Sequence, residues 1–369
     1  VRAAMFLRAT SLARGHSGVR PVLVERLAAL LNHGVTPEVP CYGSLGASGD
    51  LAPLSHMALV LLGQGRATVG ADATPVPGAV ALERVGLAPL ALEMKEGLAL
   101  NNGVQFSTAF GILACARIAT LLETAAIATA ISAQVMLGDD APFSAALHRL
   151  RPHPGALRAS QQILALMADS PMRQAHRPYD VDGEVQDPYN LRCAAQVLGA
   201  CHDLLDDARR TFMIEANAVT DNPVILEHDD NPGEYTHIVS GGHFHGMPVA
   251  VRLYGLFEVL GIASRLSNMR CARFVDERRN KGLGADLKWP SLAPDEDAVS
   301  SAMMIPEYVS AALTNAIWGA AMPSHLFSMS TDAGQEDHVS MSAGLAVRLW
   351  ETLPRLAEVL AIELAFGAQ

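Results

Sequence analysis

Apolar positions in this chain recur mostly at spacings of three and four residues, the period of a helix with one buried face. That spacing predicts helices over residues 22–32, 51–62, 104–137, 191–218, 248–279, 305–317 and 339–365. Segments rich in Gly, Pro and polar residues predict loops at 151–154, 171–190 and 228–247, and short strands or a loop excursion at 66–90. The sequence lacks the sustained two-residue alternation of a β-sandwich or barrel. The predicted fold class is therefore mainly α.

The longest predicted helix, 104–137, has Arg117 and Glu123 as its only charges. A helix that is apolar on nearly every side is typical of the core of a large bundle. Two charge-free runs, 98–116 and 308–331, contain several Asn, Ser and Thr residues, which makes them poor membrane spans. We therefore expect buried helices and no membrane association.

Composition adds a second expectation. Half of the 369 residues are hydrophobic, only 18% are charged, and the formal net charge is −11. The hydrophobic content excludes intrinsic disorder, and the acidic balance argues against a nucleic-acid partner. A low charge content, against the roughly 25% of typical soluble domains, predicts that copies of the chain cover part of its surface. Five cysteines without CxxC spacing and the lack of a signal-peptide pattern predict buried, reduced thiols in a cytoplasmic protein.

The sequence Gly-Ala-Ser-Gly-Asp at 46–50 precedes the helix predicted at 51–62. Local physics favours a Gly-rich turn that caps this helix through Ser48 or Asp50. The segment lacks the phosphate-loop and GxGxxG patterns and is no nucleophile elbow. A second interpretation is that Ala47, Ser48 and Gly49 cyclise into a 4-methylidene-imidazole-5-one ring (MIO).

The cyclisation depends on these three residue types. The Gly49 amide nitrogen attacks the Ala47 carbonyl carbon, and two dehydrations follow, one of which removes the Ser48 hydroxyl. Ser48 stands in the middle because its Cβ becomes the exocyclic methylidene. Gly49 has no Cβ to obstruct the approach of its nitrogen. The ring is an electrophile that unmodified side chains do not supply.

Six segments together resemble the MIO-dependent aromatic amino acid lyases and aminomutases, and within them the histidine ammonia-lyase branch. They are GSLGASGDLAPL at 43–54, KEGLALNNG at 95–103, VQDPYNLRC at 185–193, DNP at 221–223, SGGHFHG at 240–246 and QEDHVSM at 335–341. Glu336 in the last segment favours the histidine branch. The chain departs from the family pattern at His243, Gly334 and Asn315-Ala316, which bears on the substrate more than on the cofactor.

The resemblance implies a long-helix bundle of the fumarase/aspartase-like superfamily. It implies one domain over 1–369, with the MIO loop at 43–54 and a central bundle at about 102–369. The family's N-terminal loop with a catalytic Tyr and its C-terminal helices are expected to lie outside this chain. Family members are homotetramers whose active sites are built from several subunits.

The resemblance also implies a set of site residues. Ala47, Ser48 and Gly49 would form the MIO group, with no external cofactor. Tyr189 and Glu336 would be catalytic, and Glu336 would pair with the imidazole or amine of the substrate. Asn102, Gln186, Arg192 and Phe244 would bind substrate, Asn102 through the substrate carboxylate or the MIO carbonyl.

Each of these residues has a simpler alternative. Gln186, Tyr189 and Arg192 are spaced at i, i+3 and i+6, so a helix would place a buried amide, phenol and guanidinium on one face. Their alternative is a loop-capping Arg beside a surface Tyr. Asn102 could instead be the N-cap of the long helix, and Glu336 a solvated charge. His243 and His245 lack a third metal ligand at suitable spacing, so we predict no metal.

The implied reaction removes ammonia from L-histidine to give trans-urocanate. Two alternatives stay open. One is an MIO enzyme for phenylalanine or tyrosine, as a lyase or an aminomutase. The other is a truncated, non-catalytic homologue that serves as an oligomeric scaffold.

Overall fold

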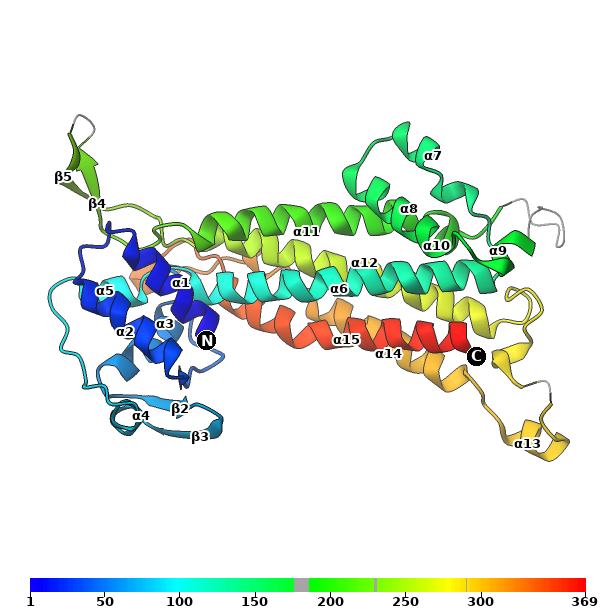
Figure 1. Ribbon diagram of the computed structural model, residues 1–369, viewed down its shortest axis with the longest axis horizontal. Helices are drawn as coiled ribbons and strands as arrows, with labels where there is room; N and C mark the ends of the chain where they lie inside the picture. The colour runs from blue at the N-terminus through cyan, green and yellow to red at the C-terminus, as the bar shows by residue number, and fades with distance from the viewer. Residues whose placement is uncertain (176–185, 229–230, 290) are drawn as a thin grey trace. The chain divides into compact units, whose positions relative to one another are not determined.

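The computed structural model describes residues 1–175, 186–228, 231–289 and 291–369, and helices dominate it (Figure 1). The mainly α fold predicted from the apolar spacing is confirmed. The chain forms two compact units. The first comprises Val1–Leu113, Ala208–Tyr254 and Pro323–Trp350, and the second comprises Ala114–Asp207, Gly255–Met322 and Glu351–Gln369. Each unit is described by itself below.

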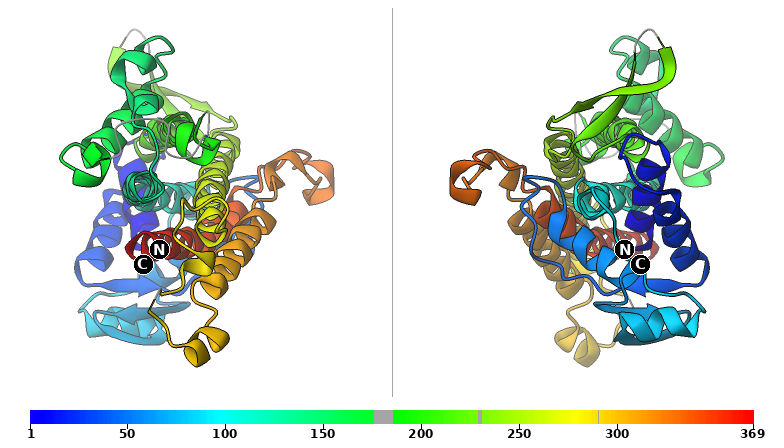
Figure 2. Two further views of the ribbon diagram at one scale, coloured as in Figure 1. Left: turned by 90° about the vertical axis from the view of Figure 1, so that its right-hand side faces the viewer. Right: turned by 90° about the vertical axis from the view of Figure 1, so that its left-hand side faces the viewer.

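The N-terminal part of the first unit combines helices with a small sheet (Figure 2). Its elements are α1 (Arg2–Ala13), α2 (Pro21–Asn32), β1 (Val35–Pro37), α3 (Leu51–Leu61), β2 (Arg66–Val69), β3 (Asp72–Pro77), α4 (Gly78–Arg84) and α5 (Glu96–Asn101). Helix α2 begins with Pro21, whose fixed φ suits a first helical position. Its Leu23, Leu27 and Leu30 are fully buried and form one apolar stripe. The three strands pair antiparallel in the order β1-β2-β3, which confirms the short strands predicted at 66–90.

A second antiparallel pair, β4 (Val224–His228) with β5 (Asn231–Val239), follows a cis Asn222–Pro223 bond. The loop predicted at 228–247 is therefore wrong for β5. Ile238 is 76% exposed, and Leu226 and Val239 are also exposed. Apolar residues exposed on both strands leave little of the alternation that sequence patterns detect.

Four long helices contribute residues to both units: α6 (Gln105–Val135), α11 (Ala194–Ala216), α12 (Met247–Val275) and α15 (Ser342–Ala368). The predicted helix at 104–137 matches α6 within two residues at each end. The one predicted at 191–218 is divided into α10 (Tyr189–Arg192) and α11 at Cys193. By length and composition alone, α6 and α12 could cross a membrane, but 39% and 50% of their most apolar windows are buried within the chain. The core helix of a bundle meets the same test, so this is weak evidence for a span.

Shorter elements complete the second unit and the final loop. They are the α-helices α7 (Ala145–Arg149), α8 (Pro154–Leu166), α9 (Pro171–Ala175), α13 (Pro294–Val299) and α14 (Met304–Ala320), and 3-10 turns at Ala141–Phe143, Ala285–Leu287, Ser324–Leu326 and Asp332–Gly334. The predicted loop at 171–190 is wrong for α9 and for the start of α10, and its residues 176–185 lie outside the described residues.

The five cysteines are free, and Cys115, Cys201 and Cys271 are buried as predicted. Burial raises the pKa of Cys201 to about 12, which keeps that thiol protonated and unreactive. Cys41 is exposed and Cys193 is half-buried, so the prediction of burial is wrong for Cys41. Cys41 follows Pro40 in the loop before the Gly-rich turn, where no helix covers it.

Candidate functional site

The Gly-rich segment that precedes α3 folds back on itself. The Ser44 hydroxyl accepts a hydrogen bond from the Gly46 amide and donates one to the Gly49 carbonyl, both at 3.1 Å. These two bonds close a turn around Ala47 and Ser48, of which Ala47 is buried and Ser48 half-buried. The segment therefore holds the Ala-Ser-Gly tripeptide in a tight bend, as the cyclisation hypothesis requires.

Ser48 contacts two of the predicted site residues. Its Oγ donates a hydrogen bond to Glu336 Oε1 at 2.7 Å, and its carbonyl oxygen accepts one from Asn102 Nδ2 at 2.8 Å. The structure thus brings Ser48, Asn102 and Glu336 together from three distant parts of the sequence. All three lie in the first unit.

Glu336 is fixed by its own loop as well as by Ser48. Thr331 Oγ1 donates to Glu336 Oε2 at 3.1 Å, and the two residues exchange backbone hydrogen bonds of 2.9 and 3.2 Å. Glu336 is half-buried, with both carboxylate oxygens hydrogen-bonded. The alternative of a solvated surface charge is therefore wrong.

Gly49 lies against Gly103, at the turn between α5 and α6. The Asp50 amide donates to the Gly103 carbonyl at 2.6 Å, and Gly49 pairs with Gly103 in a parallel bridge. A Cβ on Gly49 would stand 2.3 Å from the Gly103 carbonyl oxygen, and its φ is +82°. Backbone contact this close requires a glycine.

Asn102 is the C-cap residue of α5, and α6 begins only at Gln105. Its predicted alternative, the N-cap of the long helix, is therefore wrong. Its Oδ1 is buried without a hydrogen-bond partner among the described residues. Asn102 thus leaves one acceptor available beside Ser48 while its amide nitrogen is used.

Asp50 occupies the N-cap position of α3 but makes no cap hydrogen bond. Its fully buried carboxylate accepts hydrogen bonds from the Ser107 amide and hydroxyl, both at 2.8 Å. The expectation that Ser48 or Asp50 caps α3 is wrong, because one side chain binds Glu336 and the other binds α6. Burial raises the pKa of Asp50 to about 6, although the Ser107 hydrogen bonds and the charge of Arg8 oppose that shift.

Arg8 on α1 supports the turn that carries Asn102, and the sequence analysis missed it. Its buried guanidinium donates to the carbonyls of Ala99 (2.9 Å) and Asn102 (2.7 Å) and to the Gln105 side chain. Burial lowers the pKa of Arg8 to about 10. Arg8 lies three positions after Met5 and four before Leu12, so helical spacing places it on the buried face of α1. A basic residue at such an apolar position is the signal that could have identified it.

Phe244 is half-buried in the segment 240–246, which lies against the Glu336 loop. His245 Nε2 lies 3.0 Å from the His338 carbonyl oxygen, and the Met247 amide donates to His245 Nδ1 at 3.2 Å. Both ring nitrogens of His245 therefore have protein partners. Within the described residues, no group of three or more His, Cys, Asp or Glu side chains could hold a metal ion.

Gln186, Tyr189 and Arg192 lie in the second unit, and the structure describes them separately from the Ser48 group. Helix α10 covers only Tyr189–Arg192, so Gln186 lies in a bend before it and the three do not share one helical face. All three are exposed on the single chain, Tyr189 by 66%. The expectation that they are buried is wrong for the chain by itself.

The comparisons agree with this geometry, since the family described as aromatic amino acid lyase matches residues 1–369. The chain belongs to the aromatic amino acid lyase family. It is 42% identical to the histidine ammonia-lyase of Gloeobacter violaceus over 369 residues, covering 100% of this chain and 68% of that protein. The predicted family and the predicted class of enzyme, a carbon–nitrogen lyase, are confirmed.

Two solved structures of related lyases and mutases share the fold. Histidine ammonia-lyase from Trypanosoma cruzi superimposes with a TM-score of 0.86 at 31% identity, covering 99% of this chain and 67% of that one. Phenylalanine aminomutase from Pantoea agglomerans gives a TM-score of 0.89 at 32% identity, covering 100% of this chain and 71% of that one. The helical fold of this aromatic amino acid lyase is therefore shared by enzymes of more than one activity.

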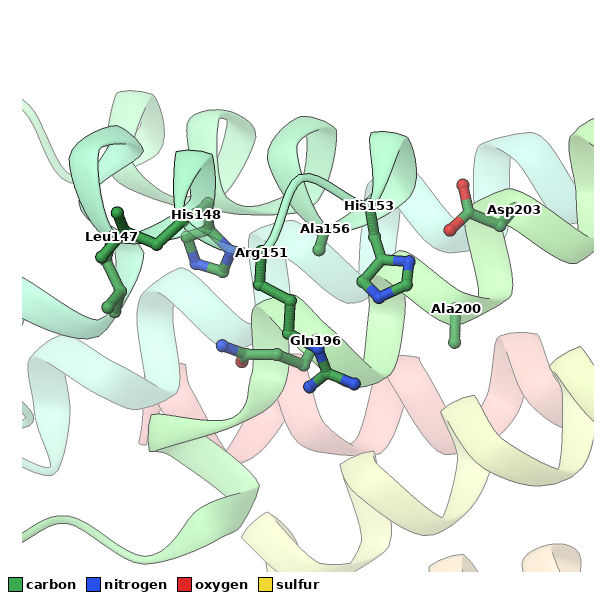
Figure 3. A pocket seen from close by; sticks show the side chains of 9 residues that line it. Leu147, His148, Arg151, His153, Ala156, Gln196, Ala200 and Asp203 are labelled. Atoms are coloured by element: carbon green, nitrogen blue, oxygen red, sulfur yellow. The ribbon is translucent and has the colours of Figure 1, made fainter.

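The second unit of this aromatic amino acid lyase contains a cavity of about 390 Å³ (Figure 3). It is lined by Leu147, His148, Leu150, Arg151, His153, Ala156, Gln196, Ala200 and Asp203. None of the predicted site residues lines it. The candidate active site is therefore assigned from the Ser48 contacts and the motifs, and not from the size of a cavity.

Proposed function

We propose that this chain is a histidine ammonia-lyase, which eliminates ammonia from L-histidine to give trans-urocanate. The observation that carries the proposal is the pair of hydrogen bonds that Ser48 makes with Glu336 and Asn102. Relatives named histidine ammonia-lyases, which are 42–44% identical over the whole of this chain and 67–68% of their own length, support the same substrate. The proposal includes an MIO group made from Ala47, Ser48 and Gly49.

The residues present fit that group. Ring closure bonds the Gly49 nitrogen to the Ala47 carbonyl carbon, and the Ser48 carbonyl oxygen then becomes the oxygen of the ring. Asn102 Nδ2 already donates to that oxygen. A side chain on Gly49 would collide with Gly103, so the space around the future ring suits only glycine at this position.

The MIO group, once formed, supplies an electrophile for the substrate amine. The protein's own residues hold the substrate against it. Arg192 would bind the α-carboxylate through two parallel hydrogen bonds, assisted by Gln186. Glu336 would pair with the imidazole or the amine, because a carboxylate stabilises their protonated forms. The Tyr189 hydroxyl would donate a hydrogen bond to the substrate, and Phe244 would pack against its ring.

The proposal also covers assembly and location. Gln186, Tyr189 and Arg192 are exposed on the single chain, which suits side chains that complete an active site in another copy. We therefore include a homotetramer with active sites shared between subunits, working in the cytoplasm. One lyase domain over residues 1–369 stays a prediction.

Purified protein incubated separately with histidine, phenylalanine and tyrosine tests the activity. Urocanate, cinnamate and coumarate are each detected by their ultraviolet absorbance. We expect urocanate from histidine alone, and none from the Ser48→Ala variant, whose circular dichroism should match the wild type. Formation of none of the three acids by the complete natural protein would contradict the proposed lyase.

The second candidate is an aminomutase, favoured by the similarity to Pantoea agglomerans phenylalanine aminomutase. An aminomutase returns the amine to the neighbouring carbon, so its product is a β-amino acid without the extended absorbance. Proton NMR of the same incubations separates the two. A β-amino acid from phenylalanine or tyrosine, with no urocanate from histidine, would replace the first proposal with the second.

A further inference from the structure

The hydroxyl of Ser48 lies in a defined hydrogen bond. The partner, Glu336 Oε1, is 2.7 Å away and 288 positions along the chain. The contact is therefore made by the fold and not by proximity in sequence. Among the described residues, Glu336 is the only side chain that hydrogen-bonds to Ser48 Oγ.

The two oxygens of the Glu336 carboxyl have separate partners. Oε1 lies on Ser48, while Oε2 accepts a hydrogen bond from Thr331 Oγ1 at 3.1 Å. An antiparallel backbone bridge between Thr331 and Glu336 also fixes this loop. This arrangement aims one oxygen of the carboxyl at the Ser48 hydroxyl and anchors the other.

Ser48 is held from two sides. Asn102 binds its carbonyl oxygen, and Glu336 binds its hydroxyl. Formation of the ring leaves the carbonyl oxygen in place and removes the hydroxyl. The Ser48 carbonyl oxygen, which is kept, binds the Asn102 amide. The Ser48 hydroxyl oxygen, which is lost, binds the Glu336 carboxyl group, which can take up and release a proton.

We propose that Glu336 donates the proton with which the Ser48 hydroxyl leaves during formation of the MIO group. This role in maturation is distinct from the proposed contact between Glu336 and the substrate. It rests on the proposed function only in that an MIO group is formed. Thr331 is a positioning residue for the carboxyl.

The step balances as a loss of one water. The Glu336 carboxylate, which accepts the Ser48 hydrogen bond, first takes up a proton from solvent. The Cβ–Oγ bond of Ser48 then breaks with its electron pair on Oγ, which takes that proton from Glu336 and leaves as water. The Cα–H proton passes to solvent, and its electron pair forms the Cα=Cβ double bond, so that Glu336 ends as the carboxylate with which it began. Hydroxide is a poor leaving group, and a positioned general acid accelerates such a step by about 10²–10⁴-fold.

The test measures maturation directly, by mass, and does not depend on lyase activity. Chain made by cell-free synthesis is sampled over time, and the tryptic peptide 27–66, which contains Ala47-Ser48-Gly49, is weighed. The variants are Glu336→Gln, which keeps the shape but carries no acidic proton, and Thr331→Val with Thr331→Ser as its rescue. Asp337→Asn, at an exposed neighbouring carboxylate, is the matched control.

We expect the wild-type and Asp337→Asn peptides to lose the mass of two waters. In Glu336→Gln the Ser48 hydroxyl should be retained, or lost about 100-fold more slowly. Thr331→Val should slow the loss by about 2- to 10-fold, the worth of one hydrogen bond, and Thr331→Ser should restore it. If Glu336→Gln does not fold, the comparison of Thr331→Val with Thr331→Ser tests the proposal instead.

Two results would overturn different statements. Loss of two waters from Glu336→Gln at the wild-type rate, or from Thr331→Val without delay, overturns the role of Glu336 and leaves the MIO group standing. A wild-type peptide that keeps the mass of an unmodified Ala-Ser-Gly overturns the MIO group itself.

Discussion

At Gly49 the backbone has a φ of +82° and passes directly beside Gly103. A left-handed conformation alone costs a residue with a Cβ about 1–2 kcal/mol. At Gly49 a Cβ would also meet three backbone atoms of Gly103 between 2.3 and 2.7 Å away, none of which can rotate aside. Position 49 therefore combines a conformational and a steric requirement.

Gly70 offers a matched comparison, because it has a φ of +62° but nothing within 4 Å of an added Cβ. Gly70→Ala should lower the unfolding free energy by about 1–2 kcal/mol and leave the two-water loss complete. Gly49→Ala should lower it by more than this and abolish the mass loss. Equal unfolding free energies for the two variants, measured in urea, would show that the contact with Gly103 does not matter.

The buried Asp50 carboxyl should make the unfolding free energy depend on pH, and its burial sets the sign of that dependence. Its pKa is raised from 3.8 to about 6 because desolvation favours the neutral acid in the folded state. The unfolded chain ionises first, so the stabilisation is present below pH of about 4 and is lost as the pH rises through about 6. A shift of this size corresponds to about 3 kcal/mol of unfolding free energy.

Urea unfolding of wild type and Asp50→Asn, from about pH 4 to 7, checks this. The difference between wild type and variant should fall with rising pH, because asparagine does not ionise. Asp72, whose pKa is lowered from 3.8 mainly by hydrogen bonds from Thr74, gives a control because its stabilisation is already complete above its ordinary pKa. For Asp72→Asn the same difference should therefore stay level over this pH range. If the unfolding free energies of wild type and Asp50→Asn change with pH in parallel, the pKa of Asp50 is not raised.

The family resemblance named Ser48, Asn102 and Glu336, which the structure brings together, but no sequence pattern predicted the partners of Asp50. A cap rule looks only a few residues along the chain, whereas Asp50 binds Ser107, 57 positions away. Arg8 was missed for the same reason, since its acceptors lie more than 90 positions from it. Local propensity does not contain such contacts.

At the scale of elements, the long helices were predictable because each has buried apolar positions at regular spacing. Helix α6 matched within two residues at each end. The failures are elements whose described residues are largely exposed. Strand β5 ends in the exposed residues Ile238 and Val239, and α9 has no buried residue. The spacing of apolar residues indicates buried faces, so it does not predict these exposed elements.

A buried ion pair links three helices of the second unit. Arg270 of α12 donates to both carboxylate oxygens of Glu363 on α15, one bond measuring 2.9 Å, and Ser132 of α6 donates to the same carboxylate at 2.7 Å. Arg270 and Glu363 are fully inaccessible to solvent. A pair of this kind contributes little compared with apolar packing, but breaking it leaves one charge buried alone.

Glu363→Gln should therefore lower the unfolding free energy by about 3–5 kcal/mol. The double variant Arg270→Met, Glu363→Gln should recover much of that loss, because no uncompensated charge remains. Urea unfolding at one protein concentration measures both, with unchanged m-values as the condition for comparing them. A double variant less stable than Glu363→Gln would mean that Arg270 stabilises the helices through other contacts.

The composition of the whole molecule is consistent with the proposed assembly. The chain is only 18% charged, and its helix α14 exposes apolar residues in a regular series. The exposed fractions are 48% for Ile305, 56% for Tyr308 and 45% for Val309, and Ala312 and Ala316 continue the series one and two turns further. An apolar stripe at helical spacing on the outside of a chain is typical of a helix that packs against another copy.

Val309→Glu tests whether this stripe is buried in an assembly. Burying an ionised carboxylate at an apolar contact is strongly unfavourable, so the variant should shift the protein from a tetramer toward species near the 39.1 kDa of one chain. Light scattering after size-exclusion chromatography measures the mass. Val80→Glu, at an exposed valine of α4, is the control and should leave the mass unchanged.

The same variant separates ring formation from activity. Ala47, Ser48, Gly49, Asn102 and Glu336 all lie in the first unit of one chain. The tryptic peptide of Val309→Glu should therefore still lose two waters, while the urocanate production of the variant falls. A tetramer that survives Val309→Glu would place the contact between subunits elsewhere.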